Sequence, residues 1–276
     1  MSQAAQQPVT ERKSWKPLAR ALLDRFGYGI GLTVVVLLMW EVGVKVGNVP
    51  RYLLPPPSVI AVTFVADWHI IYLNIEPTLI AILAGFALSV VIGVPLASLM
   101  VFSHLAERIL YPPMVASQAI PKVAIAPLFI VWMGYGITPK VWIAFLIAFF
   151  PIVIDTVIGL RSVPPEMLQL GRSMGGGTLR VFVKLRLPHA LPNVFAGMKV
   201  AITLAVVGAI TGEFVGSQSG LGFLLTSASG QMDTALVFAV LVTISVIAMV
   251  LFAIIEGLER LAIPWHASMR SRKVGH

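Results

Sequence analysis

The sequence predicts an all-α membrane protein with about six membrane-spanning helices. Of its 276 residues, 58% are hydrophobic and only 12% are charged, whereas a soluble domain has roughly 45–50% apolar and about 25% charged residues. The apolar residues gather in runs of about 20, the length that a helix needs to cross a hydrocarbon core of roughly 30 Å. The absence of cysteine excludes disulfides and thiolate chemistry.

The N-terminal region predicts a basic segment, residues 1–27, followed by the first span, residues 28–47. A cleaved signal peptide is the alternative. Its apolar part is usually about 7–15 residues long and ends at a small-residue cleavage site, and neither criterion is met here. The proline-rich residues 51–58 then predict an extended link, and residues 59–68 a short helix at the membrane interface.

Five further spans follow along the chain, at residues 76–101, 112–134, 138–160, 196–216 and 234–257. The third contains Pro112, Pro113, Pro121 and Pro127. Because proline removes a backbone donor, we expect this span to be kinked and to find hydrogen-bond partners inside a bundle.

The distribution of Lys and Arg predicts the orientation. Fifteen lie in the segments of one side, and three (Lys45, Arg51 and Lys140) lie on the other. Since basic loops stay in the cytoplasm, both termini, including the basic tail 258–276, are predicted to be cytoplasmic. The net charge of +8 does not indicate nucleic-acid binding, because the basic residues flank apolar runs instead of forming one stripe.

The long cytoplasmic loop, residues 161–195, has helix signals of its own. We expect a helix from Glu166 to Met174 that ends at Gly175-Gly176-Gly177. Thr178 is expected to cap a second helix, Leu179 to Leu187, which Pro188 would end. Such a segment projects from the bilayer and presents Met167, Leu170 and Met174 to a partner. The alternative is a loop that packs on the membrane surface.

At these residues the sequence resembles the EAA loop of ABC importer permeases. That pattern is Glu-Ala-Ala, three residues, Gly, nine residues, Ile, one residue, Leu-Pro. Here Gln169-Leu170-Gly171 replaces Glu-Ala-Ala, and Gly175, Leu185 and Leu187-Pro188 have the matching spacing. Five other stretches resemble the nitrate/sulfonate/taurine (bicarbonate) branch of these permeases: Leu54–Ser58, Ile120–Leu128, Val131–Gly134, Leu187–Pro192 and Gly220–Phe223.

The resemblance implies a type I importer permease fold with a core at residues 70–257 in a bacterial inner membrane. It implies a second permease copy, two ATPase subunits that bind ATP, and a separate solute-binding protein that delivers a small anionic solute such as a sulfonate, taurine or nitrate. No phosphate-binding G-x-x-x-x-G-K-[ST] motif is present, so the chain is not expected to be the ATPase itself. We expect it to hold no cofactor and to have no catalytic residues. The implied ATPase-docking residues are Glu166, Gln169, Gly171, Gly175, Leu185, Leu187 and Pro188.

Three charged residues are candidates for the pathway, because charges within spans usually face a pore or a partner. Lys122 is expected either to attract an anionic cargo, to pair with Asp155, or to extend to the cytoplasmic interface. Asp155 is a candidate salt-bridge partner or helix cap, and Glu213 a candidate for the outer gate. Glycines 208, 212, 216 and 220 predict close helix packing or a hinge.

Two other function classes fit less well. A transporter or channel driven by ion gradients often carries internal repeats and several charges at mid-membrane, and neither is clear here. A membrane enzyme would need a catalytic or metal cluster, but the five histidines lack ligand spacing.

Overall fold

The computed structural model describes residues 16–264, so residues 1–15 of the predicted basic segment and 265–276 of the basic tail lie outside the described residues. Every regular element in the described range is helical. In chain order these are α1 (Lys16–Val46), α2 (Pro57–Ala66), α3 (Trp68–Phe102), α4 (His104–Gln118), α5 (Lys122–Met133), α6 (Ile137–Arg161), α7 (Pro165–Ser173), α8 (Thr178–Val181), one π-helical turn η1 (Phe182–Arg186), α9 (Leu187–Gly216), α10 (Leu221–Gly230) and α11 (Thr234–Ala262).

Four stretches of helix in the described part are long and apolar enough to cross a membrane: α3, α6, the continuous run Thr178–Gly216, and α11. The pair α4 and α5 passes the same test only together, and the chain bends by 100° between them. The helix α1 covers the first predicted span, although the side chains of its first turns lie outside the described set. The molecule is therefore an all-α membrane protein, as predicted, but the third predicted span is two helices and the sequence did not predict α10.

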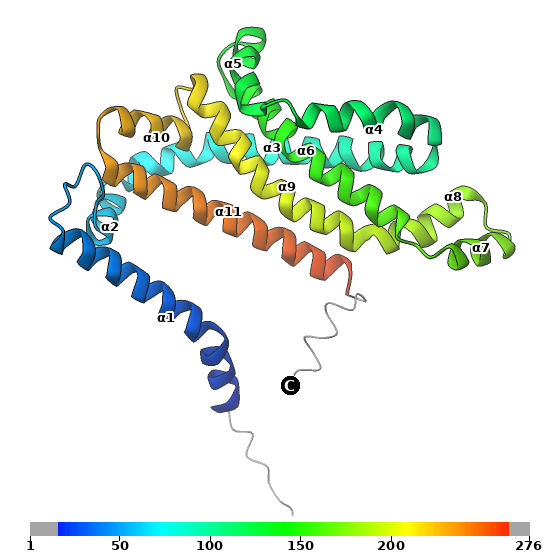
Figure 1. The fold of residues 1–276 in the computed structure, drawn as a ribbon, viewed down its shortest axis with the longest axis horizontal. Helices are drawn as coiled ribbons and strands as arrows, with labels where there is room; N and C mark the ends of the chain where they lie inside the picture. Colours follow the sequence, from blue (N-terminus) through cyan, green and yellow to red (C-terminus); the bar gives the residue numbers. More distant parts are fainter. Residues whose placement is uncertain (1–15, 265–276) are drawn as a thin grey trace, which may run out of the picture.

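The predicted third span is bent far more sharply than a kink. Helix α4 ends at Gln118, and α5 begins at Lys122 after Pro121, whose backbone is extended. Because the residue before a proline is disfavoured in the helical region, Ile120 cannot continue α4. In Figure 1, α4 lies along α3 while α5 turns away from it.

Helix α6 is the centre of the bundle, between α3 and α9. Gly85 of α3 and Gly208 of α9 both approach Ala144 so closely that a Cβ on either would lie 2.6 Å from an Ala144 atom. Gly212 faces Lys140 in the same way. Small residues at these contacts let three membrane helices pack at short distance without a hydrophobic driving force. The predicted close packing is confirmed for Gly208 and Gly212, whereas Gly220 lies beyond the end of α9.

The outer layer is formed by α11, α2 and α1. Helix α11 packs on α9 and α2, and Trp40 of α1 contacts Phe238 of α11 with ring centroids 5.5 Å apart and the rings tilted by 58°. Glu41 of α1 accepts a 2.7 Å hydrogen bond from the Ser58 hydroxyl of α2. Away from these contacts α1 diverges from the bundle (Figure 1).

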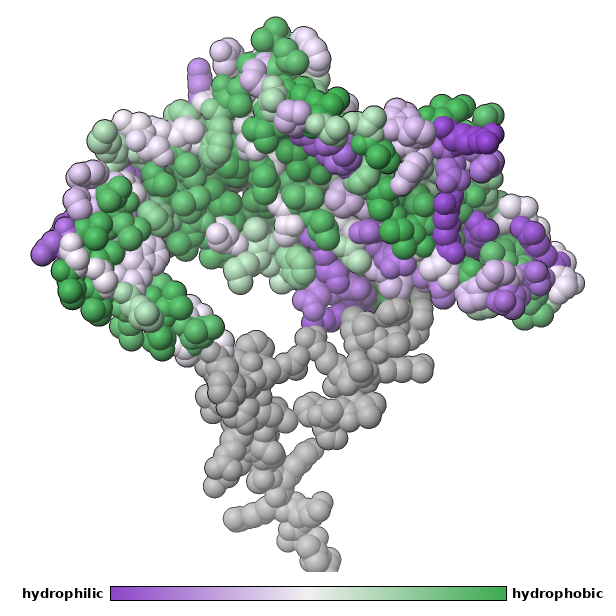
Figure 2. Space-filling view, in the orientation of Figure 1, coloured by the Kyte–Doolittle hydropathy of each residue, from purple (hydrophilic) through white to green (hydrophobic). Residues whose placement is uncertain are grey.

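The surface has a hydrophobic middle and a hydrophilic end. Figure 2 shows mostly hydrophobic side chains over the middle of the bundle and hydrophilic ones gathered at the end with α7 and α8. We call this the knuckle end, and the opposite end, with α2 and α10, the α10 end. Exposed apolar side chains such as Leu38, Val91 and Met249 suit a lipid environment, which imposes no cost on them.

Two predictions about the loop 161–195 are wrong. Thr178 does not cap a helix, because Gly177 holds the N-cap position and Thr178 is the first helical residue. Pro188 does not end the helix either, since the chain stays helical from Thr178 to Gly216. The turn η1 explains this: Leu187 N–H donates to the Phe182 carbonyl, five residues back. The wider π turn gives a proline ring room that an α-helical turn would not.

Candidate functional site

The knuckle consists of α7, α8 and the glycine turn between them, residues 165–181. Helix α7 ends as predicted at the glycines. Gly175 has φ +76°, its N–H donates to the Arg172 carbonyl at 3.0 Å, and Gly176 N–H donates to the Gly171 carbonyl at 3.0 Å. This pair of bonds is a Schellman motif, which satisfies the last carbonyls of the helix and fixes the direction of the exit.

Gly171 and Leu185, two positions of the resembled motif, meet in the fold. A Cβ at Gly171 would lie 2.7 Å from Leu185 Cδ1 and 3.5 Å from Val181 Cγ2. Helix α7 is thus held against α8 and η1 by one glycine and two aliphatic side chains. Leu187 and Pro188 are half-buried in the first turn of α9, so the motif links the knuckle to a membrane helix.

An exposed apolar stripe runs along α7. Met167 and Leu170 of α7 and its C-cap residue Met174 are exposed, Leu170 at 61% and Met174 at 78%, and their spacing of three and four residues places them on one side of the knuckle. Glu166 and Gln169 are exposed beside them. An apolar stripe on an otherwise polar, basic end indicates a surface that another protein covers.

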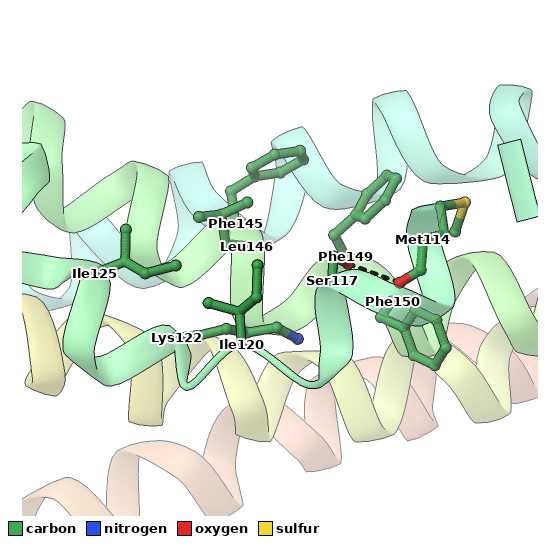
Figure 3. Close-up of a pocket in the computed structure, with 9 residues that line it drawn as sticks. All are labelled: Met114, Ser117, Ile120, Lys122, Ile125, Phe145, Leu146, Phe149 and Phe150. Carbon is green, nitrogen blue, oxygen red and sulfur yellow. Dashed lines mark hydrogen bonds between the residues drawn. The ribbon is translucent and has the colours of Figure 1, made fainter. Parts of the chain in front are cut away.

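A second feature is a cavity of about 200 Å³ at the bend between α4 and α5, which we call the bend cavity. Figure 3 shows Lys122 on one side of it and Phe145 and Phe149, from α6, on the other. The lining residues are Met114, Ser117, Ile120, Lys122, Ile125, Phe145, Leu146, Phe149 and Phe150. Lys122 is the one charged residue among them.

Lys122 lies at mid-depth of the bundle. Its neighbour across the cavity, Phe149, is twelve residues from both ends of α6, Ile137 and Arg161, or about 18 Å at the helical rise of about 1.5 Å per residue. A lysine side chain is too short to reach the interface from there, which argues against the snorkelling alternative. The predicted pairing of Lys122 with Asp155 is also absent: the ammonium donates instead to Gln118 Oε1 at 3.0 Å.

Asp155 is half-buried on α6, where its side chain lies against Gly197 of α9. Within residues 16–264 it makes no hydrogen bond or ion pair. The predicted roles of salt-bridge partner and helix cap are therefore not observed.

Glu213 sits in a third place, inside the α10 end, and is 1% exposed. Its carboxylate accepts hydrogen bonds from the Thr78 hydroxyl at 2.9 Å and from Gly222 N–H at 2.7 Å. Lys140 Nζ lies 3.5 Å from Glu213 Oε1 and donates to the Ser219 carbonyl at 2.8 Å. We call these residues the Glu213 cluster. Glu213 is thus enclosed by protein, and its role at the outer gate stays a prediction.

The Glu213 cluster fixes the turn between α9 and α10. Thr78 also accepts from Leu221 N–H at 2.8 Å, and Asn74 accepts from Gly220 N–H at 2.8 Å. Gly220 has φ +111°, and a Cβ there would overlap Glu213 Oε1. The turn thus needs glycine both for its backbone conformation and for space.

Sequence reasoning missed Lys140 and Thr78 as members of this cluster. Lys140 was counted as an outer-loop residue, yet it is 4% exposed and lies in the first turns of α6. A signal was available: Lys140 lies near the start of the fourth span and Glu213 near the end of the fifth. Both ends fall on the same side of the membrane.

Comparison with known proteins places this architecture in a family. Residues 89–264 match the model of the family described as binding-protein-dependent transport system inner membrane component. The chain is 38% identical over 255 residues to the riboflavin transport system permease protein RibX of Chloroflexus aurantiacus, covering 89% of this chain and 94% of that protein. It is 36% identical over 233 residues to the formylaminopyrimidine transport permease protein ThiX of Halalkalibacterium halodurans, covering 84% and 93%.

The branch named from the sequence motifs is represented as well. The taurine transport system permease protein TauC of Escherichia coli is 25% identical over 269 residues, with 95% of this chain and 96% of that protein covered. Among solved structures, a chain of the MetNI methionine ABC transporter superposes with a TM-score of 0.60 at 18% identity, covering 71% of this chain and 98% of that one. Its fold is the type I importer fold that the motifs predict. This chain therefore belongs to the family of binding-protein-dependent transport system inner membrane components and is a permease subunit of an ABC importer.

Proposed function

We propose that the knuckle is the surface on which a separate ATPase subunit docks and through which ATP binding moves the bundle. The observation that carries this proposal is the exposed apolar stripe of Met167, Leu170 and Met174 on a short helix with a fixed cap. A partner that covers the stripe gains about 25 cal/mol per Å² of apolar surface removed from water. The ATP and its hydrolysis belong to that partner.

The charges around the knuckle support a cytoplasmic position. Arg161, Arg172, Arg180, Lys184 and Arg186 lie within or next to it, and basic residues at the ends of membrane helices are retained on the cytoplasmic side. The proposed orientation places the α10 end outside. There the binding protein would deliver cargo, and a second copy of the chain would complete the pathway.

The connection between the knuckle and α9 supports a lever. Helix α8, η1 and α9 form one uninterrupted helical run from Thr178 to Gly216, so a push on α7 is passed to α9 through the Gly171–Leu185 contact without an intervening loop. Helix α9 packs along α6. Movement of the knuckle by the motor would thereby tilt the centre of the bundle.

For the cargo we propose a small organic solute with oxygen acceptors. The sequence motifs suggest a sulfonate, taurine or nitrate. The relatives at 38% and 36% identity are named for riboflavin and formylaminopyrimidine, and the one at 25% for taurine. The higher identity favours a planar nitrogen heterocycle over a small inorganic anion.

The docking proposal is tested with Leu170→Asp and Met174→Asp, which place charges in the stripe and leave the glycine cap intact. Both variants should insert normally and lose co-purification of the ATPase subunit by at least tenfold. Leu170→Met is the matched control and should retain it. If the Asp variants bind and stimulate the ATPase as the wild type does, the knuckle is not the docking surface.

The energy source is tested separately in proteoliposomes that contain the permease, the ATPase and the binding protein. Uptake should stop when ATP is withdrawn and should persist when ion gradients are collapsed. The opposite result would favour the gradient-driven alternative.

A further inference from the structure

The bend cavity holds a positive charge that lacks a counter-charge. Lys122 is half-buried, its ammonium meets the neutral amide oxygen of Gln118, and none of the nine residues that line the cavity is acidic. No carboxylate in the described part of the chain lies within ion-pair distance of it. A charged side chain inside a membrane is costly and usually faces a pathway or a partner, so its presence here indicates a use.

The backbone adds to the positive field at this place. Lys122 is the first residue of α5, and the N-cap residue is Pro121, which supplies no side-chain cap. Ala124 N–H donates to the Pro121 carbonyl at 2.9 Å, but the N–H groups of Lys122 and Val123 have no acceptor among the described residues, and a helix N-terminus carries roughly half a positive charge. The Lys122 ammonium and the positive end of the α5 dipole therefore lie on the same side of the cavity.

The opposite side is aromatic. Phe145, Phe149 and Phe150 line the cavity together with the flexible side chain of Met114. Phe145 and Phe149 pack against each other with ring centroids 5.2 Å apart, and Phe145 also meets Trp142 edge to face at 5.5 Å. Phe145 and Phe149 both border the cavity. A cavity of about 150 Å³ lined by such side chains accommodates benzene. The bend cavity, at about 200 Å³, has room for one ring and a small polar substituent.

We propose that the bend cavity is a cargo-binding site at mid-membrane for a planar aromatic or heteroaromatic ring that carries an anionic or carbonyl oxygen. The ring stacks against Phe145 and Phe149, and the oxygen replaces Gln118 as the partner of the Lys122 ammonium. The inference rests on the proposed import function and adds to it the chemical class of the cargo and the residues that hold it.

The bend itself makes such a site possible. A straight third span would fill the space beside Phe149 with its own side chains, whereas the 100° turn between α4 and α5 leaves it open. Irregular backbone at membrane depth is tolerated where it lines a cavity. The prolines that break the span thus place the first residue of α5, and with it the cation, beside the rings.

The test uses the permease–ATPase complex in nanodiscs and three probes: benzenesulfonate (ring and anion), ethanesulfonate (anion without ring) and benzyltrimethylammonium (ring with the opposite charge). Binding is measured by saturation-transfer NMR. We expect benzenesulfonate to bind at least tenfold more tightly than either of the others. Equal binding of ethanesulfonate would overturn the aromatic part of the inference, and equal binding of the cation would overturn the role of Lys122.

The variants Lys122→Met and Phe149→Leu should each reduce benzenesulfonate binding at least tenfold. The matched controls are Lys199→Met and Phe238→Leu, a partly buried lysine and a phenylalanine of membrane helices outside the cavity, and these should bind as the wild type does. Unchanged binding in Lys122→Met would overturn the site.

ATPase stimulation by the binding protein is recorded in parallel. If the binding protein does not stimulate ATPase activity in the wild-type complex, the import function is wrong. If it does stimulate ATPase activity but the wild-type complex does not bind benzenesulfonate, only the cavity site is wrong.

Discussion

The Glu213 cluster and the bend cavity both contain a lysine within the membrane part of the molecule, but only the lysine of the Glu213 cluster has a carboxylate as its partner. Lys140 is buried beside a carboxylate and donates to a backbone carbonyl. Lys122 faces a cavity with one neutral amide as its partner. The first arrangement is complete in the chain alone, whereas the second lacks the anion that would balance it.

This difference separates structural charge from charge available to a ligand. In the Glu213 cluster each polar group has a protein partner, and together they tie the α9–α10 turn to α3 and α6. Removing one member leaves another buried and unpaired, which is costly. In the bend cavity, removal of Lys122 instead eliminates the free-energy cost of a charge that has no counter-charge. Stability measurements on paired variants therefore distinguish the two regions.

The largest effect is expected for Glu213→Ala. It leaves Lys140 buried without its counter-charge, and breaking such a pair costs about 3–5 kcal/mol. Thermal unfolding in detergent should show a marked loss relative to wild type. The double variant Glu213→Ala/Lys140→Met should recover at least half of that loss. Purely additive losses would show that the two residues do not stabilise one another.

Lys122→Met should change stability in the other direction. Removing an uncompensated charge from mid-membrane should raise the free energy of unfolding by up to about 3 kcal/mol. The paired measurement is Lys140→Met, which should lower it. If both lysine variants destabilise to the same extent, the contrast between the two regions does not hold.

Gly220→Ala should destabilise the protein by about 1–3 kcal/mol. The residue has φ +111°, and its added Cβ would overlap Glu213 Oε1, so the variant combines backbone strain with displacement of the carboxylate. Gly230→Ala is the control, since nothing lies within 4 Å of a Cβ at that position. A neutral Gly220→Ala would mean that the turn is not held over Glu213.

The smallest effect is expected for Lys199→Met. Lys199 pairs with Glu259 at 2.8 Å between α9 and α11, but both side chains are partly exposed. Exposed pairs contribute about 0.2–1 kcal/mol, and this partly exposed pair is expected near the top of that range. If Lys199→Met lowers the free energy of unfolding as much as Glu213→Ala does, partial exposure does not weaken an ion pair in this bundle.

Local signals in the sequence were sufficient for most of the long helices and for the knuckle, but not for α10 or for the separation of α4 from α5. The apolar runs placed the spans, and the three glycines placed the end of α7, because hydropathy and capping depend on residues within a few positions of one another. The same local reasoning failed at Thr178 and Pro188. It took the proline for a helix stop, whereas a π turn carries the helix past it.

The candidate site divides in the same way. The sequence by itself determined that the chain spans a membrane, that a glycine-capped helix protrudes from it, and that Lys122 falls in a proline-broken segment. Only the tertiary structure decided that Lys140 meets Glu213, that Asp155 does not meet Lys122, and that aromatic rings of α6 face the bend. Those outcomes depend on which faces of distant helices pack together. That is set by the close approach of glycines such as Gly85 and Gly208 to α6, a property of the whole bundle and not of any one segment.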